Sequence, residues 1–340
     1  MREYLLPSSG KFYRTNLHTH TTVSDGQKTP KEIKELYKSA GYSVLAITDH
    51  NRLVHYPELC DEDFLVLPGV EYDVAADTPE FRPARSVYHI NFYPEDPENV
   101  AMPCFHPKYL YHDICDQPYV GEPNYERKYE KINEIVAEYR KHGFIAALNH
   151  PTWSHQTIED YRKLDLSQFF AMEIYNNAAY LTEGHYEINT HLYDKLLREG
   201  NRIFCTATDD AHNFDFIMPP DACTCGGFVM IKAEELTHKA VIDALKNGSF
   251  YASTGPLIEE LYVEDNRLCV KTSPAARIVL STGYRCTRVA YPASPHTGIC
   301  EATFDIGPIH PGYIRITVTD ARGHMAWSQP YFKSDPAITK

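Results

Sequence analysis

The feature that most constrains the fold is an alternation, from the first residues to about residue 255, of short apolar runs with segments of helical periodicity. Such alternation is typical of chains that fold as β/α units around a parallel sheet or barrel. In the first unit, Thr29 and Pro30 mark a helix start and Gly41 marks its end. Between them, apolar residues recur on one helical face: Ile33, Leu36, Tyr37 and Ala40. We therefore predict an α/β fold for this part of the chain.

Further apolar runs are expected to form buried strands, and three later segments are expected to form helices. The strand candidates are 44–48, 64–71, 86–93, 144–150, 171–176 and 202–208. The helix candidates are 124–142, 185–199 and 233–247, the last closed by Asn247 and Gly248. Nearly every cluster of polar side chains falls at the C-terminal end of a predicted strand, where parallel α/β folds carry their active sites.

Two regions depart from this alternation. Residues 94–123 hold Pro, Tyr and His without a sustained period, and they are predicted to be an insertion loop over the site, either a functional lid or a surface excursion. After Ser253–Pro256 the helical pattern gives way to short alternating segments, which are typical of a small antiparallel β-sandwich. We expect a main domain over 1–255 and a small all-β domain over 256–340.

Composition limits the classes of function. A formal net charge of -13 argues against non-specific nucleic-acid binding, which needs a basic surface, so short oligonucleotides are the only nucleic-acid substrates we consider. A small anionic substrate is still expected, because bound divalent cations would dominate the local field. The segment MREYLLPSSGKFYR has no long apolar stretch, so neither a secretory signal nor a membrane anchor is predicted, and a cytoplasmic location is expected. The oligomeric state is left open.

Cysteine usage agrees with that location. The nine cysteines, an odd number without a repeating spacing, are expected to be free or buried thiols in a reducing compartment. The one close pair, Cys223 and Cys225, is interpreted as structural, because an isolated C-x-C motif is a weak metal signal.

The strongest functional signal begins with His18 and His20 in NLHTHTTVSDG. Residues two apart on an extended strand end project to the same side, so both imidazoles can bind one metal ion. Taken alone, the pair could equally be two surface histidines. Other strand ends, however, carry further ligand-type residues: Asp49, His50, Glu71, His150, Asp210 and His212. Their recurrence at strand ends that converge on one mouth predicts a metal centre.

Together these motifs resemble the PHP (polymerase and histidinol phosphatase) family of metal-dependent phosphoesterases. The resemblance covers roughly residues 12–255 and rests on HTHTTVSDG, ITDHN, GVE, VYHINFY, LNHP and TDDAH. It implies a distorted (β/α)7-type barrel, to which the small C-terminal β-sandwich would be attached.

The resemblance also implies two or three divalent ions. One would be held by His18, His20, Glu71 and Asp210, and Glu71 would bridge to a second held by His89 and His150. A third would lie on Asp25, His50 and His212. Mixed nitrogen and oxygen ligation leaves Mn, Zn, Fe and Mg open, although the oxygen ligand of the third site favours Mn or Mg over Zn. Asp49 and Asp209, each beside a ligand, are expected to orient imidazoles rather than to bind metal.

The expected chemistry is hydrolysis of a small phosphorylated or nucleotide-type substrate by a hydroxide that bridges the ions, with Glu71, Asp210 and His20 as catalytic residues. The sequence contains no G-x-S-x-G, G-x-x-x-x-G-K-[ST] or G-x-G-x-x-G motif that would point to another mechanism. Substrate contacts are expected from arginines near the motifs and histidines just past ligand strand ends: Arg14, Arg52, Arg82, Arg85, His55 and His155.

Two alternatives stay open. The same centre could hydrolyse an ester, amide or carbamate, because FYASTGP and the C-terminal segment ending AWSQPYF resemble a PHP branch that includes carbamate hydrolases. A pocket rich in arginine would favour a phosphate substrate, and an apolar pocket would favour an acyl substrate. In the other alternative the metals only hold the fold of a non-catalytic binding module. Against it, every motif keeps a ligating residue.

Overall fold

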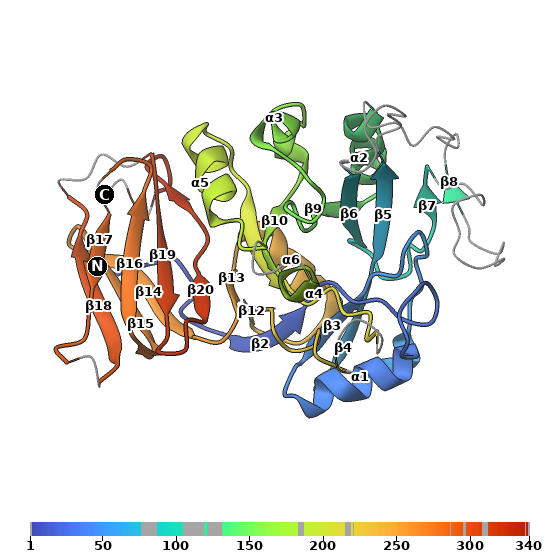
Figure 1. Ribbon diagram of the computed structural model, residues 1–340, viewed down its shortest axis with the longest axis horizontal. Helices are drawn as coiled ribbons and strands as arrows, with labels where there is room; N and C mark the ends of the chain where they lie inside the picture. The colour runs from blue at the N-terminus through green and yellow to red at the C-terminus, as the bar shows by residue number, and fades with distance from the viewer. Residues whose placement is uncertain are drawn as a thin grey trace.

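The molecule has an α/β part, at the right of Figure 1, and a β-sandwich, at its left. The computed structural model describes residues 2–75, 87–104, 119–120, 131–182, 187–214, 219, 221–285, 287–294, 297–307, 312–336 and 338. Several sequence predictions fall outside these residues: Arg82, Arg85, most of the insertion 94–123, and the first residues of the helices predicted over 124–142 and 185–199.

One sheet of the α/β part has five strands, in the order β11-β10-β9-β6-β5. Four of its strands run in the same direction, but β6 runs antiparallel to both of its neighbours, a reversal that the predicted β/α alternation does not include. Because β6 is reversed, its N-terminal end lies at the same edge as the C-terminal ends of the parallel strands. The strands are β5 (Val70–Ala75), β6 (Val87–Pro94), β9 (Phe144–Leu148), β10 (Ala171–Asn176) and β11 (Phe204–Thr208).

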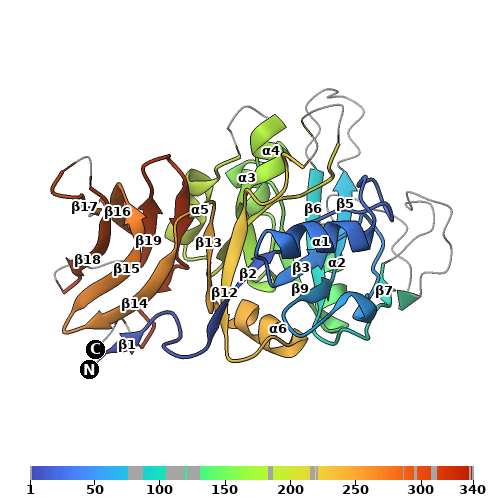
Figure 2. The same cartoon turned by 90° about the horizontal axis from the view of Figure 1, so that it is seen from below.

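The second sheet has ten strands and runs through the whole molecule. Its α/β portion is the parallel set β2 (Lys11–Asn16), β3 (Val44–Ile47) and β4 (Leu65–Pro68), next to the antiparallel pair β12 (Phe228–Ala233) and β13 (Phe250–Ser253). Figure 2 shows β13, β12, β2 and β3 side by side. Beyond β13 the sheet continues with β20 (Met325–Trp327), β19 (Tyr313–Thr319), β16 (Arg277–Thr282) and β17 (Arg288–Ala290), with β21 (Tyr331–Phe332) paired to β19.

The predicted C-terminal β-sandwich is present. A four-stranded sheet packs on the C-terminal strands of the ten-stranded sheet around a core that includes Leu261, Val270, Ile278 and Ile316. This sheet consists of β1 (Glu3–Tyr4), β14 (Ile258–Glu264), β15 (Arg267–Ala275) and β18 (Ile299–Asp305). Because β13 pairs with β20, one sheet crosses the predicted boundary at residue 255. The boundary itself stays a prediction.

A buried ion pair also joins the two parts. The Arg315 guanidinium, from β19, lies 2.9 and 3.0 Å from the two carboxylate oxygens of Asp194, and the Arg315 side chain is buried. Nearby, the Gln329 side chain donates to the carbonyl oxygen of Cys205 and accepts from its N–H, so it pairs with β11 as a strand backbone would. The β-sandwich therefore holds the outer edge of a strand that leads into the site.

Four of the described helices lie where the sequence patterns indicate, and two short ones, over 158–161 and 177–182, were not predicted. In α1 (Pro30–Ser39), Thr29 forms a capping box with Glu32, and Ile33 and Tyr37 are buried, as predicted. The helix α6 (His238–Asn247) ends at Gly248, whose φ of +69° is the left-handed conformation that glycine adopts without strain. The other helices are α2 (Ile132–Lys141), α3 (Ile158–Tyr161), α4 (Asn177–Thr182) and α5 (Thr190–Arg198).

The five-stranded and the ten-stranded sheets enclose apolar side chains between them, among which are Val44, Leu67 and Ile145. Outside the named strands, the sheets meet through parallel bridges between Thr19 and Ala211 and between His50 and Glu71. The described strands do not form a closed, continuously hydrogen-bonded barrel, so the fold is a mixed α/β fold and the (β/α)7-type closure stays a prediction. Within the described residues, the structure has no helix with the length and apolar character needed to cross a membrane.

Candidate metal centre

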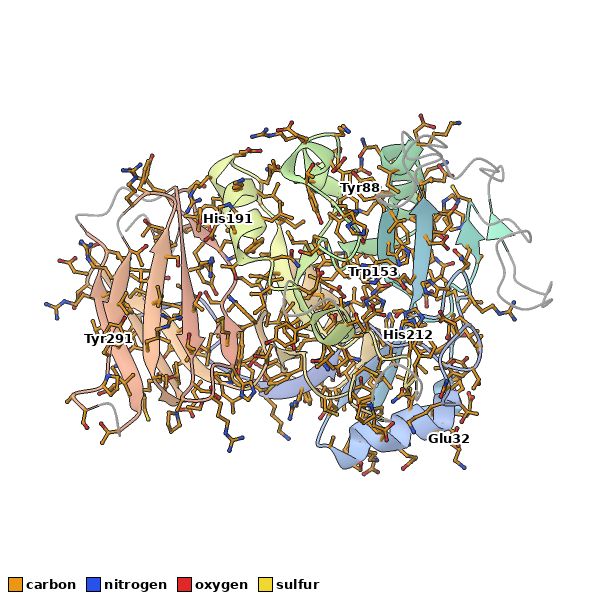
Figure 3. The ribbon with its side chains drawn as sticks, in the orientation of Figure 1. Glu32, Tyr88, Trp153, His191, His212 and Tyr291 are labelled. Carbon is orange, nitrogen blue, oxygen red and sulfur yellow. The ribbon has the colours of Figure 1, made fainter. Side chains whose placement is uncertain are left out.

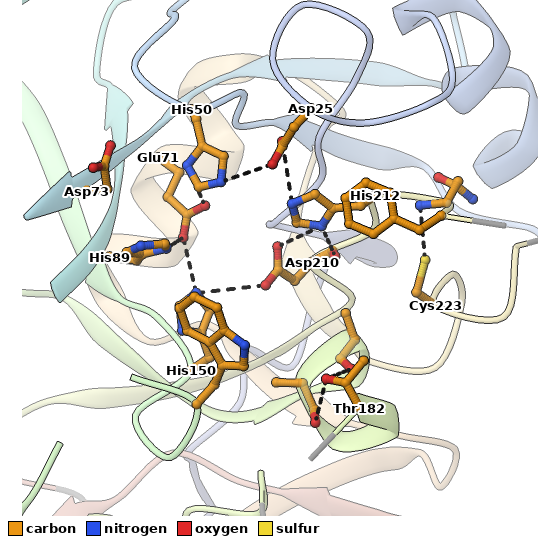
Figure 4. Close-up of a pocket in the computed structure, with 15 residues that line it drawn as sticks. Asp25, His50, Glu71, Asp73, His89, His150, Thr182, Asp210, His212 and Cys223 are labelled. Carbon is orange, nitrogen blue, oxygen red and sulfur yellow. Dashed lines mark hydrogen bonds and ion pairs between the residues drawn. The ribbon is translucent and has the colours of Figure 1, made fainter. Parts of the chain in front are cut away.

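The ligand-type side chains predicted from the sequence lie together where the ends of the two sheets meet. Figure 4 shows those that line the cavity beside them, which are all but His18 and His20. The ligand-type side chains form three overlapping groups among the described residues, and within each group the ligand atoms all lie within 4.8 Å of one another. The groups are His18, His20, Glu71 and Asp210; His50, Glu71 and His89; and His20, Asp25, His50 and His212.

The first group shows the predicted geometry of the H-x-H motif. The Nε2 atoms of His18 and His20 are 3.2 Å apart, so both imidazoles point to the same place. Glu71 Oε2 lies 3.2 Å from His18 Nε2 and 3.1 Å from His20 Nε2. Asp210 Oδ1 lies 3.1 Å from each of these nitrogens. Two imidazole nitrogens and two carboxylate oxygens thus converge on one point.

Glu71 extends the cluster with its second oxygen. Its Oε1 lies 3.1 Å from His89 Nδ1 and 3.2 Å from His150 Nε2. His89 is the third residue of the reversed strand β6, which explains how a histidine at the start of a strand reaches ligands at the ends of others. The Glu71 carboxylate therefore lies between the first group and the pair of histidines, as the resemblance implies.

The third group lies on the other side of His20. Asp25 Oδ1 is 3.5 Å from His20 Nδ1 and 3.5 Å from His212 Nε2, and Asp25 Oδ2 is 3.8 Å from His50 Nε2. His50 also reaches the Glu71 carboxylate, with its Nδ1 3.3 Å from Oε2. The structure thus places His50 between two groups rather than in the third group alone.

Comparison with known proteins identifies a family for this chain. The PHP domain family model matches residues 16–207, more than half of the chain. The chain belongs to the PHP domain family. No curated protein matches it.

Solved structures that resemble this PHP protein share little sequence with it. One, from Bacteroides vulgatus, is a two-domain protein containing a predicted PHP-like metal-dependent phosphoesterase; it is 16% identical over 97% of each chain, with a TM-score of 0.45. A candidate metal-dependent phosphoesterase from Bifidobacterium adolescentis is 14% identical over 61% of this chain and 89% of its own, with a TM-score of 0.38. An amidohydrolase from Chromobacterium violaceum, with bound sulfate and no metal, is 15% identical over 58% and 87%, with a TM-score of 0.37.

A buried carboxylate that the sequence prediction missed supports two histidines of this PHP site. Glu173, inside β10, lies with Oε1 2.8 Å from His18 Nδ1 and accepts a hydrogen bond from the His150 backbone N–H at 2.7 Å. Thr208 and Asn176 donate to the same carboxylate. The available signal was a charged residue inside an otherwise apolar strand, AMEIYN.

Other ring nitrogens have partners of the same kind. His150 Nδ1 lies 3.0 Å from Ser154 Oγ, and His212 Nδ1 lies 2.9 Å from the backbone carbonyl oxygen of Asp210. Such outer partners fix the ring orientation and leave the other nitrogen, Nε2, facing the cluster.

Asp49 and Asp209 were expected to orient imidazoles. The Asp49 carboxylate accepts from Thr21 and Ser24, and so holds the turn that carries Asp25. Ser24 Oγ also lies 3.4 Å from His20 Nδ1, so Asp49 is linked to an imidazole through Ser24. The Asp209 carboxylate accepts from Tyr37 and from the backbone N–H groups of residues 225–227. Asp209 therefore supports a loop at the site, and its role in orienting an imidazole stays a prediction.

The pKa shifts follow from burial and from the close approach of opposite charges. Burial lowers the pKa of His18, but the carboxylates of Asp210 and Glu71 outweigh it and hold this pKa well above its ordinary value. The same balance raises the pKa of His20 to about 10. Burial raises the pKa of Glu71, yet the surrounding imidazoles keep it well below its usual range. The carboxylates of the cluster thus pair with its imidazolium groups, and a bound metal cation would take the place of the imidazolium protons.

The backbone has a positive φ at two of the predicted ligands, His150, with a φ of +20°, and Asp210. Asp210 has a φ of +52°, in the left-handed region that a non-glycine residue rarely adopts. Such strain persists where the surrounding structure enforces it, and it is concentrated at functional sites. Here the Asp210 N–H donates to the His18 carbonyl oxygen, which ties the strained residue to the H-x-H motif.

A cavity of about 590 Å³ lies against the centre (Figure 4). None of its described lining residues is Arg or Lys. Apart from the ligand-type residues, the described lining consists of Asp73, Trp153, Ala178, Ala179, Thr182, Asn213, Phe214 and Cys223.

Among the residues that the structure describes, none of those predicted to contact substrate lines this cavity. The Arg14 guanidinium lies over the rings of Tyr42 and Phe228, 4.5 and 4.0 Å from their centroids. Arg52, His55 and His155 also lie outside the described lining of the cavity, so their role in substrate binding stays a prediction. Trp153 and Phe214, which the sequence prediction did not select, occupy the cavity wall instead.

Proposed function

We propose that this protein is a metal-dependent hydrolase that acts on a phosphoester through a multinuclear centre on His18, His20, Asp25, His50, Glu71, His89, His150, Asp210 and His212. The observation that carries the proposal is the Glu71 carboxylate, which faces three imidazoles with Oε2 and two others with Oε1. A buried carboxylate between two such groups is suited to bridging two cations.

The donor set fits divalent ions. Because His18 Nδ1 donates to Glu173, the neutral ring carries its lone pair on Nε2, which faces His20 Nε2 and Asp210. The same reasoning applies to His212, whose Nδ1 lies 2.9 Å from the Asp210 carbonyl oxygen, an acceptor only. Imidazole with carboxylate suits Zn, Fe and Mn, and the carboxylate of Asp25 adds an oxygen ligand that Mg also accepts. The number and identity of the ions belong to the proposal.

When bound, divalent ions in such a centre activate water for attack and neutralise charge on the oxygens of the ester. The chain's own residues do the positioning. Glu71 and Asp210 supply the carboxylates that bind the cations, and His20 lies between the first and third groups, so we assign these three to catalysis. A small anionic substrate is consistent with a cavity of about 590 Å³ that lies against a cationic centre.

One observation favours a second candidate, hydrolysis of an ester, amide or carbamate at the same centre. The described part of the cavity lining holds Trp153, Ala178, Ala179 and Phe214 but neither Arg nor Lys, and a neutral acyl substrate needs no cationic side chain. Phosphoester hydrolysis is placed first because the PHP domain family supplies the precedent.

The deciding experiment measures turnover of p-nitrophenyl phosphate, bis(p-nitrophenyl) phosphate and p-nitrophenyl acetate by Mn-loaded protein. Wild type is compared with His20→Ala and with His191→Ala, a matched control on α5 away from the centre (Figure 3). We expect phosphoester turnover in wild type and His191→Ala that is lost in His20→Ala. Acetate turnover alone, lost in His20→Ala, selects the acyl hydrolase. Stoichiometric metal without any turnover of these esters counts against hydrolysis and favours the binding module.

A further inference from the structure

We propose that Trp153 is a specificity-determining residue: its indole ring forms a platform for a flat, apolar group of the substrate beside the metal centre. This inference rests on the proposed function, because it specifies which kind of ester the site accepts. The loop that carries Trp153 directly follows the ligand His150.

The indole lies against the ligand histidines and is still accessible. Its ring centroid is 4.8 Å from that of His150, at an interplanar angle of 76°, and 5.3 Å from that of His89. The Trp153 residue is 40% exposed and lines the cavity, whereas the other tryptophan of the chain, Trp327, is 1% exposed. The accessible face of this indole therefore borders the cavity beside the ligand imidazoles, where it can contact a bound group.

The loop is held in place by a buried carboxylate. Glu187 accepts hydrogen bonds from the backbone N–H of Trp153 at 2.7 Å and of Thr152 at 3.2 Å, and its residue is 0% exposed. Asn189 donates to the same carboxylate and accepts from the Thr152 hydroxyl. Burying a carboxylate to satisfy two loop amides is costly, and its result here is a fixed backbone for the loop that carries the indole.

The neighbouring wall leaves room for a ring. The residues that α4 contributes to the cavity have small side chains, Ala178, Ala179 and Thr182. Phe214 stacks on His212 with centroids 5.0 Å apart, so a second aromatic ring borders the same cavity. A flat apolar group gains from offset or edge-to-face contact with such rings, which a puckered group of equal size does not make.

The test compares two phosphate esters whose leaving alcohols are of similar basicity, benzyl phosphate and cyclohexylmethyl phosphate. We expect the kcat/KM of wild type for benzyl phosphate to exceed that for cyclohexylmethyl phosphate by about 3- to 10-fold. This ratio corresponds to the free energy that an aromatic pair contributes beyond the burial of its surface area. Trp153→Phe should keep most of this preference, and Trp153→Leu should remove it. Trp153→Met serves as the second apolar variant, with metal content as the check on folding. The same ratio in wild type, Trp153→Phe and the apolar variants overturns the inference and leaves the indole as a cover for the ligand imidazoles.

A binding measurement separates failure of this inference from failure of the proposed function. Benzylphosphonate and cyclohexylmethylphosphonate are not hydrolysed, so they report binding alone. The fluorescence emission of Trp153 is obtained by subtracting the emission of Trp153→Phe from that of wild type. In Zn-loaded protein we expect benzylphosphonate to change this emission and to bind about 3- to 10-fold more tightly than its cyclohexyl counterpart. If neither phosphate turns over but this preference is seen, the phosphoesterase proposal fails and the platform stands. Equal affinities, or no binding of either, overturn the platform.

Discussion

Replacing Glu173 by Gln should weaken metal binding although Glu173 is not itself a proposed ligand. Its Oε1 faces His18 Nδ1 and the Thr208 hydroxyl, and its Oε2 accepts from the His150 N–H and the Asn176 amide. An amide of the same shape must place its NH₂ group against one of these two pairs of donors. Two hydrogen bonds are then lost, and the charge that holds His18 in the correct tautomer is removed.

The magnitude follows from these contacts. Hydrogen bonds to a charged group are each worth about 1.5–3 kcal/mol, and loss of an outer partner of a ligand histidine typically costs about 10- to 100-fold in metal affinity. We therefore expect a 10- to 100-fold rise in the Kd for Mn²⁺ or Zn²⁺, measured by competition with a chelator at fixed pH. Glu134→Gln, an exposed position on α2, is the matched control and should leave the Kd unchanged. A Kd within about 3-fold of wild type for Glu173→Gln would refute the reasoning, because the loss of an outer partner is worth more than that.

Four further outcomes are expected. Because the pKa of His20 is raised to about 10 and that of His18 also lies well above its ordinary value, metal binding near neutral pH should release protons and tighten as the pH rises. Calorimetry in buffers of different ionisation enthalpy measures this, and a buffer-independent heat would contradict it. In the metal-free protein the raised pKa of His20 makes the fold less stable as the pH rises. The stabilisation by protonated His20 is complete below about pH 6.5 and is lost as the pH rises through about 10, which urea unfolding against pH can follow. Gly26→Ala should disturb the turn of Asp25 and lower metal stoichiometry, since an added Cβ would lie 2.5 Å from the His20 carbonyl carbon; unchanged metal content by mass spectrometry would be the opposing result. Arg315→Met should cost about 3–5 kcal/mol in urea unfolding, because it leaves the carboxylate of Asp194 beside the interface without its bidentate partner, while the Kd for metal stays the same.

Features that depend on local sequence were predictable. The start and end of α1 follow from Thr29, Pro30 and Gly41, because capping and left-handed termini depend on neighbouring residues only. Ligand-type residues that follow a strand, such as His50, His150 and Asp210, were predictable for the same reason, since the preceding strand places them. His89, near the start of β6, and Asp25, on a turn, were supplied by the resemblance. The structure brings all nine ligand-type residues together.

Features that depend on distant pairing were not predictable in the same way. The reversal of β6 and the continuity of one sheet through β13 and β20 arise from which strands become neighbours, and a periodic pattern carries no such information. Glu173 was missed because its four partners come from separate segments, so only the fold reveals why a carboxylate is buried there. The position of Trp153 was missed for the same reason, since Glu187, which accepts a hydrogen bond from its backbone N–H, lies far along the chain.

The most direct test of the central claim, a multinuclear centre bridged by Glu71, is anomalous diffraction from crystals of the Mn-loaded protein. The account predicts separate Mn peaks on the two sides of the Glu71 carboxylate, one among His18, His20 and Asp210 and the other beside His89 and His150, each about 2.0–2.3 Å from its ligand atoms. Crystals of protein that binds Mn stoichiometrically, yet with no anomalous peak at Glu71, would contradict it.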